Sequence, residues 1–476
     1  MSHHKPDPNK SVNLTIDGLS VAVPEGTTIL EAARKVNVEI PTLCDHPDLR
    51  RRAVCRLCVV ECDGRGKLYA ACANDVWEGA AVVTNNARIV GIRKTIIELM
   101  LANHPQECLN CVRSTKCELQ SLAERFGIRT TPFRRDALKR GLSEIACDTL
   151  VRDMDKCIKC GRCVDVCQEI QTVRAINTSH RSVHYDICPP YGHTLEEGPC
   201  IFCGHCATVC PVGAIFEHDH SAEVWEALGD NSRYVVAEIA PQTTAAIAGE
   251  MGLPSETVTA GKIITALKRM GFDQVYDADL FADLSAREKI IELLGRLKYG
   301  GKLPMISCCS PGGIKFIEKF FPELKLHLTS IKNPQQNFAY LTKGIHPKVT
   351  SVSVMPCIAK KFGNKKPETS SVNEPDFVLT PREFAGMIRL AGIDFDTLPE
   401  NHFDAFNAAS GKSGIPEGTK VRKIVINGLG EARDVLDAIR RDKCDADLVE
   451  ILSCPSNHFA GGGETADECT ISRILR

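Results

Sequence analysis

Sixteen residues in the first 210 have the types and the spacing that bind iron–sulfur clusters. Fifteen cysteines and one histidine form four consecutive sets, spaced C-x10-C-x2-C-x13-C, H-x3-C-x2-C-x5-C and, twice, C-x2-C-x2-C-x3-C. Such short loops let neighbouring thiolates converge on one cluster, and two tandem runs of this kind rarely arise by chance. The sets therefore predict a series of carriers for single electrons. They are Cys44, Cys55, Cys58 and Cys72; His104, Cys108, Cys111 and Cys117; Cys157, Cys160, Cys163 and Cys167; and Cys200, Cys203, Cys206 and Cys210.

The length, charge and cysteine content of the chain limit the class of protein. With 476 residues the chain is too long for one core, so three or four domains are expected. A net charge of −2 and 25% charged residues give no sign of nucleic-acid or membrane-surface binding. The polar N-terminus lacks an apolar signal core, and no apolar run is long enough to span a bilayer. We therefore expect the 24 cysteines to be reduced thiols of a cytoplasmic protein.

The first set lies in a predicted hairpin–helix context. Residues 11–23 alternate apolar and polar around an Asp17-Gly18 turn, and Thr28 with Glu31 forms a capping box that opens a helix. This order resembles the β-grasp fold of plant-type 2Fe–2S ferredoxins, and the cysteine spacing is the variant of complex I and NAD-linked hydrogenases. A zinc site is the alternative. We assign residues 1–83 to a 2Fe–2S ferredoxin-like domain.

The second set follows a predicted helix over residues 86–103. The segment resembles one that holds a 4Fe–4S cluster with a single histidine ligand, here His104, and three cysteine ligands. A neutral imidazole makes the cluster less negative, which raises its reduction potential. We assign residues 84–145 to this histidine-ligated 4Fe–4S segment.

The third and fourth sets predict a bacterial two-cluster ferredoxin over residues 146–222. In this pattern the fourth cysteine of each run binds the other cluster. Cys210 therefore joins the first three cysteines of the third set, and Cys167 joins those of the fourth.

The remaining residues, 223–476, predict an α/β domain with a largely parallel sheet. Apolar strand candidates alternate with amphipathic helical stretches. The strand candidates are YVVAEIAP, PMISCC, TSVSVMPC and KIVING, and the helical stretches are GKIITALKRMG and SAREKIIELLGRL.

Three motifs in this domain carry a resemblance to FeFe hydrogenases: SCCSPG at 307–312, MPCIAKK at 355–361 and SCPSNHFAGGG at 453–463. The resemblance covers nearly the whole chain, because larger members of the family, of the NAD-linked and electron-bifurcating type, carry the same four upstream cluster modules. It implies a 4Fe–4S cube held by cysteines of these motifs, the last of which bridges the cube to a di-iron centre that makes hydrogen.

The chain departs from the family at that centre. His458 stands where the family has the bridging cysteine, and a neutral imidazole cannot bridge two irons. Lys289 takes the position of a proton-path glutamate, Gly313 that of a tryptophan, and the segment between Phe395 and Val421 is too short for the family's lid. Cys308 and Lys360, which serve the di-iron site in the family, are retained. We expect no di-iron centre.

The three motifs leave a set of candidate ligands, namely Cys309, Cys357, Cys454 and His458. Either Cys308 or Cys309 could be the first of these ligands, and we favour Cys309. One hypothesis is an additional 4Fe–4S cluster at these residues. The alternative is that the thiols only pack as small buried side chains.

These features predict an iron–sulfur electron-transfer subunit of a cytoplasmic, NAD(P)-linked, electron-bifurcating complex. By resemblance, its partners are a flavin/NADH-binding subunit and a small 2Fe–2S subunit like those of complex I. A further redox subunit, such as a hydrogenase or formate dehydrogenase, and ferredoxin are also candidates. No nicotinamide or flavin fingerprint occurs, and we expect no catalytic residue. The alternatives are an active FeFe hydrogenase subunit with an atypical cluster and, less favoured, a sensor or assembly factor.

Overall fold

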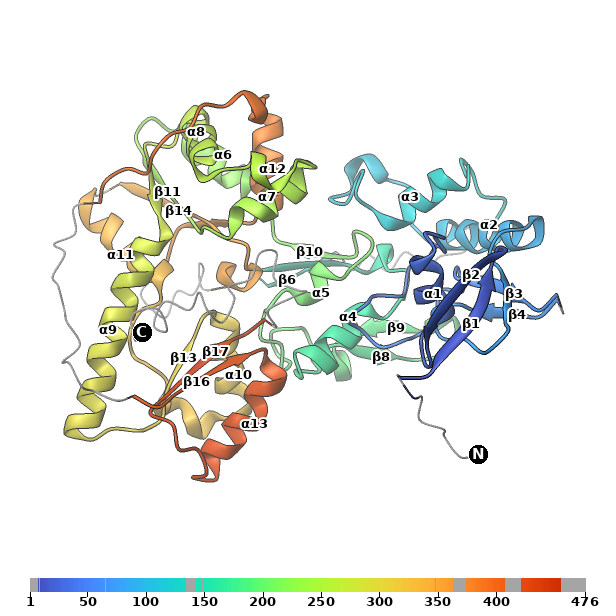
Figure 1. The fold of residues 1–476 in the computed structure, drawn as a ribbon. Coiled ribbons are helices and arrows are strands. Elements are labelled where there is room, and N and C mark those ends of the chain that lie inside the picture. The colour runs from blue at the N-terminus through green and yellow to red at the C-terminus, as the bar shows by residue number, and fades with distance from the viewer. Residues whose placement is uncertain are drawn as a thin grey trace.

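The chain forms a series of iron–sulfur-type modules followed by an α/β domain. The structure, a computed structural model, describes residues 7, 9–64, 66–133, 143–147, 149–346, 348–362, 374–406 and 421–454. Figure 1 shows the first two modules at one end, the two-run module in the middle and the α/β domain at the other end. Across the described ranges, every helix falls short of the length and apolarity that a bilayer-spanning segment requires.

The first module is a five-stranded sheet beside one helix. Its strand order is β2-β1-β5-β3-β4, with β1 and β5 parallel and the other pairs antiparallel. The predicted hairpin is present as β1 and β2. The predicted capping box is also present, because Thr28 Oγ1 accepts from the Glu31 amide and the Glu31 carboxylate accepts from the Thr28 amide. The elements are β1 (Ser11–Ile16), β2 (Leu19–Pro24), α1 (Ile29–Lys35), β3 (Val59–Cys62), β4 (Leu68–Ala70) and β5 (Ala81–Val83).

The second and third modules contain short elements around long cysteine-bearing loops. The predicted helix before His104 is α2, which Asn86 caps by accepting from the amide of Ile89. A small sheet of order β10-β7-β6 closes the two-run module, and β8 pairs with β9 in the insert between the runs. The elements are α2 (Ala87–Ala102), α3 (Glu118–Arg125), β6 (Ser143–Cys147), β7 (Leu150–Asp153), α4 (Arg162–Asp165), β8 (Asn177–Ser179), β9 (Asp186–Cys188), α5 (His205–Thr208) and β10 (Ile215–Glu217).

The α/β domain has two parallel sheets instead of the single sheet that the sequence predicts. One has the order β12-β11-β14-β15 and the other β13-β17-β16. The strands of the first are β11 (Tyr234–Ile239), β12 (Gln274–Asp277), β14 (Val349–Val354) and β15 (Phe377–Leu379). Those of the second are β13 (Met305–Cys308), β16 (Lys423–Asn427) and β17 (Leu448–Leu452). Buried parallel strands read as continuous apolar runs, which do not reveal which strands pair.

Helices cover both sheets. They are α6 (Ser221–Gly229), α7 (Thr243–Met251), α8 (Ala260–Met270), α9 (Ala278–Tyr299), α10 (Pro311–Phe320), α11 (Pro334–Ile345), α12 (Pro381–Leu390) and α13 (Leu429–Arg440). One apolar core runs without a break from the two-run module into the second sheet, and includes Ile201, Phe316 and Val449. The two-run module is therefore packed directly on this half of the α/β domain, as Figure 1 shows for α5 and the sheet of β13. The predicted fold class is confirmed.

Candidate iron–sulfur sites

The first set converges in a buried loop region of the first module. Cys44, Cys55, Cys58 and Cys72 are all buried. The sulfur atoms of Cys58 and Cys72 lie 3.3 Å apart, and the amide of Cys55 donates to Cys44 Sγ at 3.5 Å. Hydrogen bonds from the Cys55 and Cys72 thiols lower the pKa of Cys44 and raise the pKa values of the two donors, so both thiols lie within hydrogen-bonding reach of Cys44. This donor set suits a 2Fe–2S cluster.

Arg93, on α2, holds the loop that carries this set. Its buried guanidinium donates to the carbonyl oxygens of Leu57, at 3.0 Å, and Val59, at 2.7 Å. These carbonyls flank Cys58, so the helix that precedes the second set also fixes the first. Nothing in the sequence marks Arg93, since an isolated arginine in a helix is usually exposed.

The second set lies at the C-terminal end of α2. His104 Nδ1 is 2.9 Å from the carbonyl oxygen of Pro105, so a neutral ring carries its proton there and keeps a lone pair on Nε2. Nε2 is itself a buried atom. Cys117 is buried, Cys111 is half-buried and Cys108 is exposed. Burial raises the pKa of Cys117, and the nearby charges of Cys111 and Cys108 add to the shift. The imidazole is therefore suited to be a metal ligand through Nε2.

The third and fourth sets are crossed, as their spacing predicts. Burial raises the pKa of Cys163 well above its usual value, and the charges of Cys160, Cys157 and Cys210 add to this shift more strongly than that of Cys206 from the fourth set. Cys206 has the equivalent neighbours Cys203, Cys200 and Cys167. The structure thus brings Cys210 to the third set and Cys167 to the fourth.

A cavity at the fourth set has the chemistry of a cluster site. Its walls include Cys167, Cys200, Cys203 and Cys206 among mostly apolar side chains. Backbone amides donate to the sulfur atoms, from Ala175 to Cys167 at 3.2 Å and from Phe202 to Cys200 at 3.4 Å. Such hydrogen bonds raise the reduction potential of a bound cluster.

The three C-terminal motifs meet where strands of both sheets end. Cys309 follows β13, and its Sγ accepts from the amide of Ser453 at 3.4 Å, which brings it beside the Cys454 loop after β17. Cys357 follows β14 in the other sheet. The next residue in that loop, Ile358, packs against Gly204 of the fourth set. His458 lies outside the described residues.

Cys308 faces a different environment from Cys309. It is buried, and burial together with the charge of Cys309 raises its pKa, whereas the charge of Lys289 lowers it. Lys289 is also buried, on α9. Beside Cys308, a side chain at Gly313 would meet Ser453 Oγ at 2.7 Å. The space that a tryptophan needs at that position is therefore filled.

In the described part of the chain, no three His, Cys, Asp or Glu side chains are placed to hold one metal ion.

Two polar residues near the sites escape prediction from the sequence. Arg162 is buried and connects the first three modules, and His205 is buried between the fourth set and Cys454. The one available signal is that each lies between the second and third cysteines of its run. Burial lowers the pKa of His205 to about 4, which keeps its ring neutral.

The folds and sites together define a multidomain iron–sulfur electron-transfer protein. Residues 9–87 match the 2Fe–2S iron–sulfur cluster binding domain. Residues 93–132 match the NADH-ubiquinone oxidoreductase-G iron–sulfur binding region, and residues 148–216 match the ferredoxin-like domain of NADH-quinone oxidoreductase subunit 3. Residues 233–415 and 413–462 match the C-terminal domain of the iron-only hydrogenase large subunit. The chain thus carries a 2Fe–2S domain and 4Fe–4S-binding domains.

Two known relatives extend over most of the chain, and a third covers less than half of it. The NADP-reducing hydrogenase subunit HndD of Solidesulfovibrio fructosivorans is 35% identical, over 95% of this chain and 88% of the relative. Iron hydrogenase 1 of Clostridium pasteurianum is 32% identical, over 82% of this chain and 70% of the relative. The alpha subunit of the NADPH-Fe(3+) oxidoreductase of Geobacter sulfurreducens is 35% identical, over 43% of this chain and 24% of its own length. The chain belongs to the iron-only hydrogenase large-subunit family.

Proposed function

We propose that the chain relays electrons between a flavin/NADH-binding module and another redox subunit, without hydrogen chemistry of its own. The observation that carries this proposal is the continuous series of contacts between cysteine-bearing loops. Arg162 connects the first three modules, and His205 connects the fourth set to Cys454. Buried, adjacent carriers suit electron transfer through the protein.

The proposed cofactors are one 2Fe–2S cluster, three 4Fe–4S clusters and an additional 4Fe–4S cluster in the C-terminal domain. The ligands for the first four are the sets named above, with Cys167 and Cys210 exchanged between the third and the fourth set. Those for the last are Cys309, Cys357, Cys454 and His458. Cys309 is favoured over Cys308 because its sulfur accepts a hydrogen bond from the amide of Ser453, next to Cys454. We also propose the domain limits 1–83, 84–145, 146–222 and 223–476.

The absence of a di-iron centre is part of the proposal. His458 in place of the bridging thiolate supports it, as does a buried ammonium group, Lys289, where the family's proton path has a carboxylate. The closed space beside Gly313 adds to this support. Retained Cys308 and Lys360, together with the family match, favour the alternative of an active hydrogenase with an atypical cluster.

Infrared spectroscopy distinguishes these two functions. We expect protein matured with the enzymes that install a di-iron centre to show no bands from iron-bound carbon monoxide or cyanide, and no hydrogen evolution. Those bands, with hydrogen turnover, would establish the alternative. A FeFe hydrogenase matured in parallel is the positive control.

A cytoplasmic, NAD(P)-linked and electron-bifurcating complex is the proposed setting. The name of the HndD relative states NADP reduction by a hydrogenase, and two domains of this chain match regions of NADH-quinone oxidoreductases. The proposed partners are a flavin/NADH-binding subunit, a small 2Fe–2S subunit and a further redox subunit, with ferredoxin as another candidate. Native purification should yield a flavin-containing complex that reduces the chain with NADH or NADPH. A stable monomer that reacts directly with either nucleotide would contradict this.

His458 provides the test of the additional cluster. Replacing its neutral imidazole by a thiolate, in His458→Cys, should lower the potential of that cluster, whereas His458→Ala should lose the cluster. The upstream signals should not change in either variant. Iron analysis of the wild-type protein that accounts only for the four upstream clusters would exclude it.

A further inference from the structure

The two cysteine runs place a polar residue at the same position, and each such residue reaches into a different neighbouring module. In the run Cys160-Gly161-Arg162-Cys163 this residue is Arg162, and in Cys203-Gly204-His205-Cys206 it is His205. Both side chains are buried, at 6% and 3% exposure. Buried polar side chains at equivalent positions need partners, and their partners differ.

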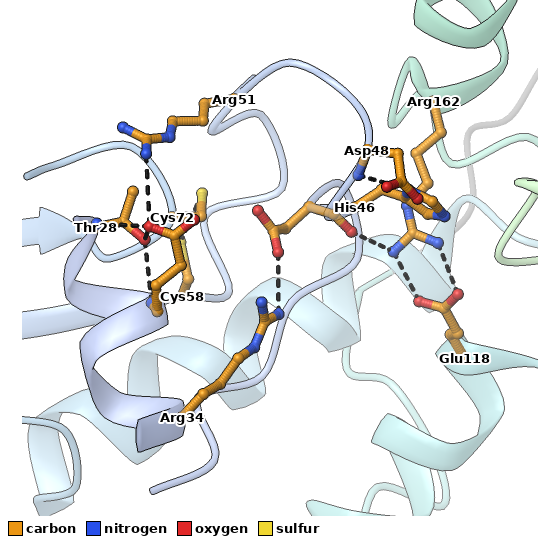
Figure 2. Close-up of polar contacts among 11 residues, drawn as sticks. Thr28, Arg34, His46, Asp48, Arg51, Cys58, Cys72, Glu118 and Arg162 are labelled. Carbon is orange, nitrogen blue, oxygen red and sulfur yellow. Dashed lines mark hydrogen bonds and ion pairs between the residues drawn. The ribbon is translucent and has the colours of Figure 1, made fainter. Parts of the chain in front are cut away.

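Arg162 contacts the two upstream modules. Its guanidinium binds the Glu118 carboxylate through two hydrogen bonds of 2.7 and 2.9 Å, and donates to the carbonyl oxygen of Asp45 at 2.8 Å. Figure 2 shows Arg162 between Glu118 and the loop of His46. Asp45 follows Cys44 of the first set and Glu118 follows Cys117 of the second. One side chain therefore touches the loops of both upstream sets.

His205 contacts the downstream domain. Its Nε2 lies 3.2 Å from Cys454 Sγ, and its Nδ1 faces Nε2 of Gln171. The same Gln171 nitrogen donates to the carbonyl oxygen of Ser453 at 3.4 Å, so it is the NH2 end of the amide that faces the ring. A ring that accepts at Nδ1 carries its proton on Nε2. His205 therefore donates to the Cys454 sulfur.

The glycine before each residue repeats this arrangement. Gly161 and Gly204 both have positive φ, +83° and +79°. A Cβ atom at Gly161 would overlap the guanidinium of Arg52, from the first module. A Cβ atom at Gly204 would meet the Cβ of Ile358, from the MPCIAKK loop, at 2.5 Å. In each run the glycine therefore leaves room for a side chain of a neighbouring module, and the polar residue after it contacts that same module.

We propose that this position of the cysteine run is the connector of the two-cluster module, with Arg162 directed to the upstream sets and His205 to the C-terminal site. Both are positioning residues that also adjust the potentials of the clusters whose loops they touch. The downstream half rests on the proposed cluster at Cys309, Cys357 and Cys454. A hydrogen bond to a ligand sulfur, and a cation near a ligand loop, both stabilise the reduced cluster.

The test compares His205→Leu with Arg162→Leu in the full-length protein, purified with its clusters under anaerobic conditions. Redox titration followed by electron paramagnetic resonance gives the potential of each signal, and loss in Cys357→Ser identifies the C-terminal one. We expect H205L to shift the C-terminal signal to lower potential and to remove one exchangeable-proton coupling from it. R162L should instead lower the potentials of the first two sets. H205Q, which retains an N–H donor, should recover part of the wild-type C-terminal potential.

Several results would contradict the proposal. A C-terminal signal unchanged in H205L, or the same signals shifted in both variants, overturns the connector role while leaving the additional cluster in place. If the wild-type protein shows no signal that Cys357→Ser removes, the additional cluster is wrong and the downstream connector falls with it. If H205L does not fold, Gln171→Leu replaces it, because it removes the donor that fixes the His205 tautomer. No shift of the C-terminal signal in that variant also overturns the proposal.

Discussion

Arg162 and Glu118 form a two-point ion pair that joins the two-run module to the second module. The guanidinium nitrogens of Arg162 lie 2.7 and 2.9 Å from the two carboxylate oxygens of Glu118. The arginine side chain is 7% exposed and the glutamate side chain 45%. Because only one partner is buried, the pair depends on Glu118 to balance a charge that water reaches poorly.

Replacing Glu118 by glutamine should therefore weaken this joint. The amide cannot neutralise Arg162, and the half-exposed position of Glu118 limits the loss of stability to about 1 kcal/mol. Thermal unfolding of the cluster-loaded protein measures it. Glu124→Gln is the matched control, since Glu124 lies on the same helix α3 and is exposed. Equal melting temperatures for the two variants would show that the pair does not stabilise the joint.

Cys55→Ser should remove the 2Fe–2S signal and leave the other signals unchanged. Cys55 lies against Cys44 within the first module, and the cysteines of the other three sets belong to separate loops. Electron paramagnetic resonance of the dithionite-reduced variant provides the measurement. Cys62→Ser is the control, because Cys62 is buried in the same module but is not part of the set. Loss of a 4Fe–4S signal in C55S would contradict independent sites.

Short sequence patterns predicted those structural features that depend only on residues close together in the sequence. The Asp17-Gly18 hairpin, the Thr28–Glu31 capping box and the helix before His104 each depend on residues a few positions apart. The crossed ligand sets of the two runs stay a prediction, which the positions of Cys167 and Cys210 in the structure support.

Long-range contacts were not predictable in this way. Arg162 reaches Asp45 across 117 residues, and His205 reaches Cys454 across 249. Nothing near either residue in the sequence specifies such a partner. The division of the C-terminal strands into two sheets was missed for the same reason, because β13 and β14 are both apolar runs that end at cysteine-bearing loops.

Gly204→Ala should disturb the contact between the two-run module and the C-terminal domain. Any non-glycine residue at positive φ costs about 1 kcal/mol, and here the new Cβ would also overlap Ile358. Gly192→Ala is the control, since Gly192 has a φ of +74° with open space around it. We expect G204A to melt at a clearly lower temperature than G192A and to weaken the C-terminal cluster signal. Similar melting temperatures would mean that the backbone strain alone matters.

Glu238, on β11, should make the stability of the C-terminal domain depend on pH. It is completely buried, Ser353 Oγ donates to it at 2.5 Å, and Lys360 is the charged group that acts on it. Burial raises the pKa of Glu238 from 4.5 to about 8, and the hydrogen bond and the lysine only partly oppose this shift. Between these two values the folded chain holds a proton that the unfolded chain releases. The contribution of protonated Glu238 to the stability of the folded chain is therefore complete below pH 4.5. It is lost as the pH rises through about 8.

Glu238→Gln tests this dependence, because glutamine has the same shape and does not ionise. The free energy of unfolding of this variant should exceed that of the wild type by little near pH 5. The difference should grow toward pH 9, up to about 5 kcal/mol for a pKa shift of this size. Melting temperatures measured from pH 5 to 9 provide the comparison, with Glu226→Gln, exposed on α6, as the control. A constant difference between Glu238→Gln and the wild type across this range would show that Glu238 does not take up a proton on folding.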